Sequence, residues 1–241
     1  MNKKLENNMI ILCGGRGRRL GKLTNQIPKP MVKIGNASII EHKLKYYRSQ
    51  GLKKFIFCLG YKGNLLKKFL QKNNTNAVFH NGGIAAGILK RIFFIRKYLK
   101  KDTLISYGDT LAKIDFKKLL LNHKKSRCPL TIVVAPIKNP FGLVAWDKKN
   151  KIKSFEEKPI LNHFIGYAVI SPSFFDKISN KIVNLKDGMG IVESIKFLIK
   201  KRKANVYKYK GLQLTINSEE ELNNVKLNYT KYFTLDEKFK K

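Results

Sequence analysis

Apolar residues in the first 135 positions form short continuous runs that alternate with helical stripes. The continuous runs predict strands buried on both faces, at residues 9–13, 54–59, 103–107 and 130–135. Between these runs the apolar residues follow the helical period, which predicts helices over residues 37–49, 64–71, 85–99 and 116–123. This alternation predicts an α/β protein, a three-layer sandwich with a mostly parallel central sheet and helices on both faces.

The second half of the chain has shorter strands with turns between them. Strands are expected at residues 142–147, 152–156 and 164–170, which favours a small mixed or antiparallel β patch. The pattern then predicts helices at 172–178 and 191–201, a strand at 205–210 and a last helix at 218–232. Neither an internal repeat nor a flexible linker is evident. We therefore expect a single domain over residues 1–241, with halves at about 9–135 and about 136–235.

Composition excludes several classes of protein. Hydrophobic residues make up 43% of the 241 positions, which is too many for a disordered chain. No apolar run approaches the roughly 18 residues of a membrane-spanning helix, and the run at 9–13 is too short for a signal-peptide core, so we expect a cytoplasmic protein. Cys13, Cys58 and Cys128 are dispersed, as are the four histidines, which indicates reduced thiols and gives no zinc-ligand spacing.

The chain carries 50 Lys and Arg against 16 Asp and Glu, a formal net charge of +34. Such a balance can indicate a nucleic-acid-binding protein. The lysines, however, recur as pairs in nearly every predicted helix instead of forming one patch, which favours a solvated surface. No helix-turn-helix or aromatic-rich motif supports specific nucleic-acid binding. The charge does favour anionic ligands such as phosphates.

A segment rich in glycine and arginine, residues 14–19, directly follows the first predicted strand. It matches neither the P-loop nor the dinucleotide-binding pattern. Glycines let backbone N–H groups approach an anion, and arginines offer forked donors for phosphate oxygens. Lys29 follows between Pro28 and Pro30, which stiffen the backbone around it. The segment therefore predicts a phosphate-binding loop, the alternative being a tight turn with solvated arginines.

Further motifs fall in a fixed order after this loop. They occupy residues 28–31, 60–63, 87–91, 107–109, 141–142 and 154–159. Together with residues 14–20 they resemble the sugar-1-phosphate nucleotidylyltransferases, and the cytidylyltransferase branch that uses glucose 1-phosphate is the most similar in these motifs. The resemblance spans residues 9 to 225 and implies a Rossmann-like fold and transfer of a nucleotidyl group from a nucleoside triphosphate, with CTP favoured, to a sugar 1-phosphate or another small phosphorylated acceptor.

The resemblance assigns the half at 9–135 to the nucleotide. It implies that Gly14, Gly15, Gly17, Arg18 and Arg19 hold the triphosphate and the departing pyrophosphate. Lys29 would lie near the α-phosphate, and the region around Gly87 would contact the base. Asp109, at the end of a predicted strand, would bind Mg²⁺, the implied cofactor, although an aspartate after a strand can also be a simple turn or helix cap.

The half at 136–235 would bind the acceptor. The resemblance implies that Lys158 holds the acceptor phosphate, that Glu157 accepts hydrogen bonds from its hydroxyl groups, and that Gly142 and Gly166 let it approach the backbone. The alternative for residues 156–158 is a solvated turn. Trp146, the one tryptophan, is expected to pack in the protein interior.

The sequence departs from the family at three positions. Arg18 adds a charge where the family often has a small residue. Phe164 replaces an Asn that usually helps to hold the sugar, which questions an ordinary hexose 1-phosphate. Asn217 stands where a second metal-binding carboxylate is expected, and its amide oxygen could ligate Mg²⁺ without adding charge. We also expect Lys90 and Arg91 to be surface residues.

These departures leave alternatives open. A non-catalytic nucleotide-binding regulatory relative is the second hypothesis, and a nucleic-acid-binding protein, suggested by charge alone, is the third. The expected partners are a nucleoside triphosphate and a small phosphorylated acceptor, with no membrane span. Relatives commonly associate, so a homo-oligomer is also considered.

Overall fold

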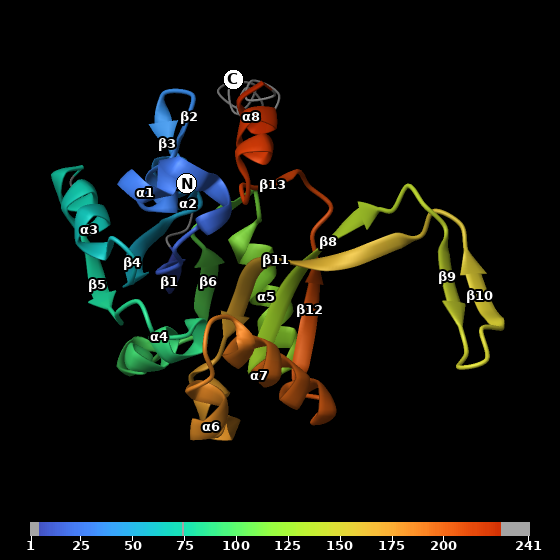
Figure 1. Ribbon diagram of the computed structural model, residues 1–241. Coiled ribbons are helices and arrows are strands. Elements are labelled where there is room, and N and C mark those ends of the chain that lie inside the picture. The colour runs from blue at the N-terminus through green and yellow to red at the C-terminus, as the bar shows by residue number, and fades with distance from the viewer. Residues whose placement is uncertain (1–4, 74, 228–241) are drawn as a thin grey trace, which may run out of the picture.

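The computed structural model describes residues 5–73 and 75–227, and its core is a seven-stranded sheet (Figure 1). The strand order is β12-β8-β11-β6-β1-β4-β5. The strands are β1 (Leu5–Cys13), β4 (Leu52–Leu59), β5 (Ala77–Asn81), β6 (Thr103–Tyr107), β8 (Leu130–Lys138), β11 (Ile160–Ile170) and β12 (Ala204–Lys208). Only β11 runs antiparallel to its neighbours, so the expected mostly parallel sheet is confirmed.

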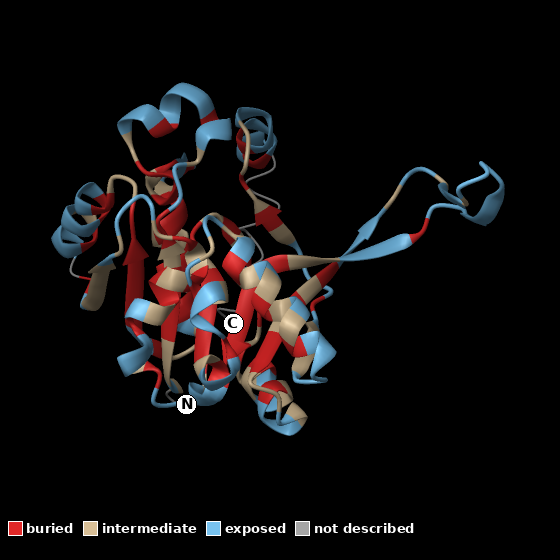
Figure 2. Ribbon diagram, turned by 60° about the horizontal axis from the view of Figure 1, so that its bottom comes forward, coloured by how far each residue is buried: buried red, intermediate tan, exposed pale blue. Residues whose placement is uncertain are grey.

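Helices cover both faces of this sheet. On one face the buried residues of α2 (Ile39–Ser49), α3 (Gly63–Lys72) and α5 (Phe116–Ser126) join Met9, Ile11 and Cys13 of β1. On the other face α4 (Ile88–Phe94), α6 (Asn180–Val183) and α7 (Met189–Lys200) pack with Ile10. Because successive side chains of a strand point to opposite faces, a strand between two layers must be apolar at every position. Figure 2 shows the resulting buried interior.

Helix α2 begins at a side-chain cap. The backbone N–H of Ser38 donates to Glu41 Oε2 at 2.7 Å, and the Ser38 hydroxyl accepts from the Glu41 backbone N–H at 3.4 Å. This reciprocal pair satisfies two donors that the first turn of a helix leaves free. The cap fixes where the chain turns from β2 (Lys33–Ile34) and β3 (Ala37–Ser38) into the helix.

A small two-stranded sheet beside the main one was not expected. β7 (Thr110–Ala112) pairs antiparallel with β13 (Gln213–Thr215), which ties the middle of the chain to its C-terminal part. A third apolar cluster joins this region to α8 (Glu219–Leu227) through Leu214, Ile216 and Leu222. Segments about 100 residues apart are thereby held together next to the end of β6.

The expected antiparallel patch is present, but it projects from the body as an arm (Figures 1 and 2). The arm comprises residues 137–161, including β9 (Leu143–Trp146) and β10 (Ile152–Glu156). The outer halves of β8 and β11 pair with each other and form its base. The expectation that Trp146 packs in the interior is wrong, because its side chain lies on this arm and is 65% exposed.

Several predicted boundaries differ from the structure. The helix expected at 85–99 begins only at Ile88, because the backbone before it lies against another segment: a Cβ on Gly87 would lie 2.2 Å from the carbonyl oxygen of Leu185. It continues after Phe94 as the short 3₁₀ helix η3 (Arg96–Tyr98), and residues 172–177 form the 3₁₀ helix η4 (Pro172–Lys177). The part of the last predicted helix beyond residue 227 lies outside the described residues.

No helix among the described residues is both long and apolar enough to cross a membrane.

Candidate functional site

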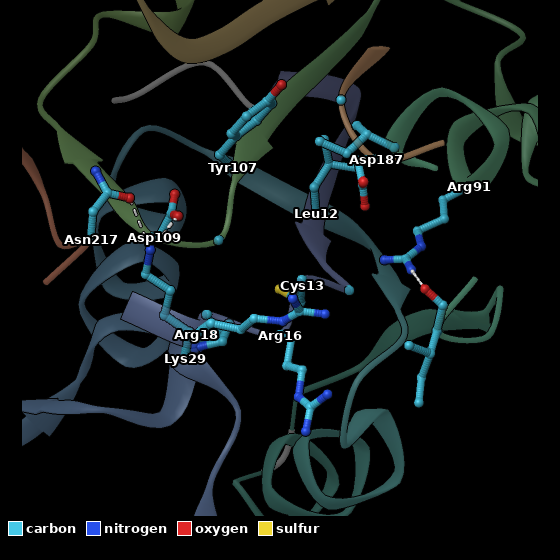
Figure 3. Close-up of a pocket in the computed structure, with 18 of the residues that line it drawn as sticks. Leu12, Cys13, Arg16, Arg18, Lys29, Arg91, Tyr107, Asp109, Asp187 and Asn217 are labelled. Atoms are coloured by element: carbon cyan, nitrogen blue, oxygen red, sulfur yellow. Dashed lines mark hydrogen bonds and ion pairs between the residues drawn. The ribbon is translucent and has the colours of Figure 1, made fainter. Parts of the chain in front are cut away.

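A cavity of about 590 Å³ opens at the carboxyl ends of β1 and β6, the edge where open α/β sheets bind ligands (Figure 3). Five cationic side chains and two carboxylates line it: Arg16, Arg18, Arg19, Lys29, Arg91, Asp109 and Asp187. The excess of positive charge suits an anionic ligand. The cavity therefore gathers, in one place, the residues on which a phosphate-binding site was predicted.

The glycine-rich segment forms one wall of the cavity. β1 ends at Cys13, and the chain turns through Gly17, whose φ of 66° is in the left-handed region that favours glycine. The turn is closed by a hydrogen bond from the Leu20 N–H to the Gly17 carbonyl at 3.0 Å. The Thr24 hydroxyl donates to the same carbonyl at 3.1 Å. This bonding holds a loop with exposed arginines at the mouth of the cavity.

Lys29 reaches two oxygens that lie far away in the sequence. Its Nζ lies 2.7 Å from Asp109 Oδ2 and 3.1 Å from Asn217 Oδ1 (Figure 3). Lys29 is only 8% exposed and opens the short 3₁₀ helix η2 (Lys29–Met31), with a proline on each side. The prolines restrict the backbone, so the ammonium group is presented in a defined place.

The pairing of β7 with β13 brings Asp109 and Asn217 together. Asp109 lies in the turn between β6 and β7, and the turn is anchored where the Gly108 N–H donates to the Leu12 carbonyl at 2.9 Å. After β13 the Ile216 N–H donates to the Asp109 carbonyl at 3.2 Å, so the next residue, Asn217, lies beside the carboxylate. The proximity is thus a product of sheet register.

The two oxygens around Lys29 suit a hard divalent cation. A carboxylate and an amide oxygen both contact one ammonium group, so a cation at that point would find oxygen ligands on two sides. Mg²⁺ commonly takes one or two carboxylates and completes its shell with water and substrate phosphates. Among the described residues no group of three His, Cys, Asp or Glu side chains gathers, so the protein alone offers a partial ligand set.

Arg91 is a buried residue of the cavity wall, and its expected position at the surface is wrong. It was expected at the surface, but it is 5% exposed and lines the cavity. Its Nη2 donates to the carbonyls of Gly83 at 2.8 Å and Ile84 at 3.3 Å, and burial lowers its pKa from the usual value. The guanidinium lies so close to Gly14 that a Cβ there would be 1.4 Å from Nη1. Arg91 therefore holds the loop at 83–84 against the glycine-rich segment.

The sequence carried a signal for this position. Arg91 lies three residues after Ile88 and four before Ile95, a spacing that places all three on one side of a helix. The apolar side of an amphipathic helix faces the core, so a charged residue on that side is expected to be buried.

Tyr107 forms the side of the cavity nearest the arm. Burial, together with the charge of Asp109, raises the pKa of Tyr107 to about 12, so the phenol stays protonated. Its ring packs edge-on against Phe164 with 5.7 Å between centroids. Gly166, at a β-bulge with φ of 76°, lies beneath this ring, and a Cβ there would be 2.8 Å from Tyr107 Cγ. Gly166 thus lies next to the cavity without lining it.

Gly87 also borders the cavity between two lining residues, Ala86 and Ile88. The Ile88 N–H donates to the Asp187 carbonyl at 2.7 Å, which joins this segment to the loop before α7. Asp187 and Gly188 line the cavity and were not among the predicted site residues, because no local motif marks them.

Three predicted acceptor residues do not reach this cavity within one chain. Gly142, Glu157 and Lys158 all lie on the arm. Glu157 and Lys158 pair loosely at 3.6 Å, and their side chains are 59% and 68% exposed. The single chain therefore assembles the predicted nucleotide residues but leaves most of the predicted acceptor residues outside.

The fold and the cavity define an α/β protein with a cationic cavity at the carboxyl edge of its sheet. The family model for nucleotidyl transferases matches residues 8–210. The chain belongs to this nucleotidyl transferase family.

Relatives differ in the base and the sugar that their names specify. The chain is 29% identical over 241 residues to a Bacillus subtilis protein named "Probable glucose-1-phosphate cytidylyltransferase", covering 88% of this chain and 92% of that one. It is 32% identical over 155 residues to the D-glycero-alpha-D-manno-heptose 1-phosphate guanylyltransferase of Campylobacter jejuni, covering 62% and 67%. The crystal structure of HddC from Yersinia pseudotuberculosis complexed with GMP-PN has the same fold, with a TM-score of 0.70 at 21% identity, covering 92% and 99%.

Proposed function

We propose that the protein is a Mg²⁺-dependent sugar-1-phosphate nucleotidylyltransferase. The observation that carries this proposal is the meeting of Lys29, Asp109 and Asn217 in the cavity lined by residues 14–19. Cationic donors for a triphosphate and oxygen ligands for a divalent cation lie within one space, which is what nucleotidyl transfer needs. The nucleotidyl transferase family and the names of its members give the reaction class.

In the proposed reaction, a phosphate oxygen of the acceptor forms a bond to the α-phosphorus of a nucleoside triphosphate. The bond from that phosphorus to the bridging oxygen breaks, and the electron pair leaves with pyrophosphate. The backbone of Gly14, Gly15 and Gly17 and the side chains of Arg18 and Arg19 bind the β- and γ-phosphates and neutralise the leaving group. Lys29 orients and neutralises the α-phosphate.

Asp109 and Asn217 are the residues that would hold Mg²⁺ on the protein side. When bound, the metal would supply charge neutralisation on the phosphate oxygens. Because Asn217 brings no charge, the nucleotide's own phosphates must supply most of the remaining ligands. We therefore infer that Mg²⁺ enters with the triphosphate.

CTP is the first triphosphate to test, because the glucose-1-phosphate cytidylyltransferase is among the relatives and the motif pattern favours that branch. GTP follows, since the heptose 1-phosphate relative is a guanylyltransferase. On the acceptor side, Phe164 packs on Tyr107 at the edge of the cavity, so this edge offers an aromatic surface where an amide would offer hydrogen bonds. An acceptor with an apolar or deoxygenated edge would fit this surface better than an unmodified hexose.

Pyrophosphate release, measured for each of the four triphosphates against a panel of sugar 1-phosphates with and without Mg²⁺, tests the proposal. We expect one pair of substrates to react, and Asp109→Ala to abolish turnover. Asp176→Ala is the matched control, since Asp176 is an exposed aspartate in η4. Turnover by Asp109→Ala at the wild-type rate would overturn the metal assignment.

A second candidate, nucleotide binding without turnover, is favoured by the uncharged Asn217. Calorimetric titration with each triphosphate and Mg²⁺ separates the two. Binding without pyrophosphate release for any acceptor supports the second candidate. Asn217→Asp would then be expected to strengthen Mg²⁺-dependent binding, because a second carboxylate adds charge to the site.

A further inference from the structure

The arm exposes an unusual amount of apolar surface. Nine large apolar side chains between residues 137 and 161 are exposed. They are Ile137, Phe141, Leu143, Val144, Trp146, Ile152, Phe155, Ile160 and Leu161. A concentration of exposed apolar side chains of this kind marks an interaction surface.

This apolar surface lies on both faces of the arm. Leu143 and Val144 are consecutive residues of β9, and Ile160 and Leu161 are consecutive residues of β11. Since neighbouring residues of a strand point to opposite faces, neither face is the solvent side. If the arm folded back onto its own body, one face would be covered and the other would stay in water. A two-stranded ribbon is also only marginally stable by itself.

The size of the patch fits a protein partner. The exposed portions of the nine side chains amount to roughly 800–1,000 Å², counting about 200 Å² for each aromatic residue and somewhat less for each aliphatic one. A stable interface buries about 800 Å² on each partner. The arm alone therefore offers enough surface for one side of a stable dimer.

The arm also carries the residues that the cavity lacks. Glu157 and Lys158 are exposed on it, and neither lines the cavity of the chain to which it belongs. Gly142 lies beside Phe155 on the same ribbon, because a Cβ there would be 2.7 Å from the Phe155 ring. The nucleotide side and the acceptor side of the proposed site are thus on separate parts of one chain.

We propose that the arm of one copy docks on a second copy of this chain and places its Glu157 and Lys158 at that copy's cavity. This inference rests on the proposed function, since it uses the acceptor role that the resemblance to the family implies for Glu157 and Lys158. A reciprocal exchange of arms buries both faces of each ribbon and completes two sites at once. Each site then combines Asp109 of one chain with Lys158 of the other.

A complementation experiment tests the exchange. Asp109→Ala and Lys158→Ala variants are each expected to be inactive, because each breaks every site of its own homodimer. In a mixture that has exchanged subunits, heterodimers contain one intact site, so about a quarter of the wild-type activity returns for a statistical mixture. If sites are built within one chain, every site carries a defect and no activity returns, which overturns the proposal.

The single tryptophan gives a readout that does not depend on activity. Trp146 lies on the arm, so its fluorescence reports whether the arm is in water. We expect a blue shift and weaker quenching by acrylamide as protein concentration rises, in step with dimer formation in sedimentation. Phe155→Ser should keep the chain monomeric and Trp146 exposed. Ile199→Ser, which changes an exposed apolar residue of α7, is the control.

The two readouts separate the inference from the proposed function. If dimers bury Trp146 but no substrate pair reacts with the wild type, the arm docks and the assigned reaction is wrong. If the wild type is active as a monomer with Trp146 in water, the arm does not dock and the inference is wrong. Activity with a buried Trp146 but no complementation places both halves of the site in one chain and also overturns the exchange.

Discussion

Replacing Lys29 by Met removes the ammonium group that pairs with Asp109 in the cavity. Lys29 Nζ lies 2.7 Å from Asp109 Oδ2, with side chains 11% and 24% exposed. Breaking a buried ion pair costs about 3–5 kcal/mol, because one charge stays without its partner. Asp109 keeps some solvent contact and the Met side chain fills the same space, so we expect a loss of about 2 kcal/mol in the free energy of unfolding.

The effect on turnover should be larger than the effect on stability. A single preorganised donor that neutralises developing charge is worth about 10²–10³ in kcat. Lys29→Met should therefore lower kcat by about this factor in a pyrophosphate-release assay, measured at a temperature where urea titration shows the variant to be folded. Lys33→Met, an exposed lysine four residues away, is the control and should keep wild-type turnover.

The same substitution predicts the opposite change in metal binding. In the structure the ammonium group occupies the space between Asp109 Oδ2 and Asn217 Oδ1. Without it, both oxygens are free to bind a divalent cation, so Mn²⁺ should bind the nucleotide-free variant more tightly than the wild type, as measured by electron paramagnetic resonance. A variant that keeps kcat within about threefold of wild type would refute the reasoning, because it would show that Lys29 does not act on the α-phosphate.

Three further predictions concern stability. Arg91→Met should cost about 1–3 kcal/mol in a urea titration, because the buried guanidinium no longer donates to the carbonyls of Gly83 and Ile84, whereas the exposed Arg96→Met should cost less than about 1. Gly166→Ala should cost about 2–3 kcal/mol, since φ is 76° and the new Cβ would meet Tyr107, and Gly15→Ala, with nothing near its Cβ, is the control. Burial lowers the pKa of His123, so the unfolded chain takes up a proton that the native protein resists. The free energy of unfolding should then fall as pH drops below about 6.5, and an equal slope in His123→Gln would contradict this.

Much of the core could be predicted from the sequence because burial leaves a local pattern. Residues 9–13 form a continuous apolar run since β1 lies between two helical layers, and alternate side chains enter the two apolar clusters. The start of α2 is also a local feature, because the capping box joins Ser38 to Glu41, three residues further along the chain. β5 was missed because it is an edge strand whose residues are only partly buried, so it has no continuous apolar run, and β7 was missed because three residues are too few for a period to show.

The pattern of apolar residues predicted the strands of the arm but not their exposure. Alternation predicted strands at 142–147 and 152–156, and they exist. The same apolar residues made Trp146 look like a core residue, because a sequence shows that a surface is apolar but not which molecule covers it. Its exposure follows from the projection of the ribbon beyond the body.

The candidate site divides in the same way. By itself the sequence predicted a phosphate-binding loop, because glycines, arginines and a lysine braced by prolines lie within one short stretch whose geometry is local. Only the tertiary structure decided that Asn217 faces Asp109, that Arg91 is buried and that Glu157 and Lys158 stand outside the cavity. These outcomes depend on the register of β7 with β13, on the close approach of the Arg91 guanidinium to Gly14, and on the course of β8 and β11 beyond the body. Contacts between distant segments are set by how the elements pack together, and a local pattern does not carry that information.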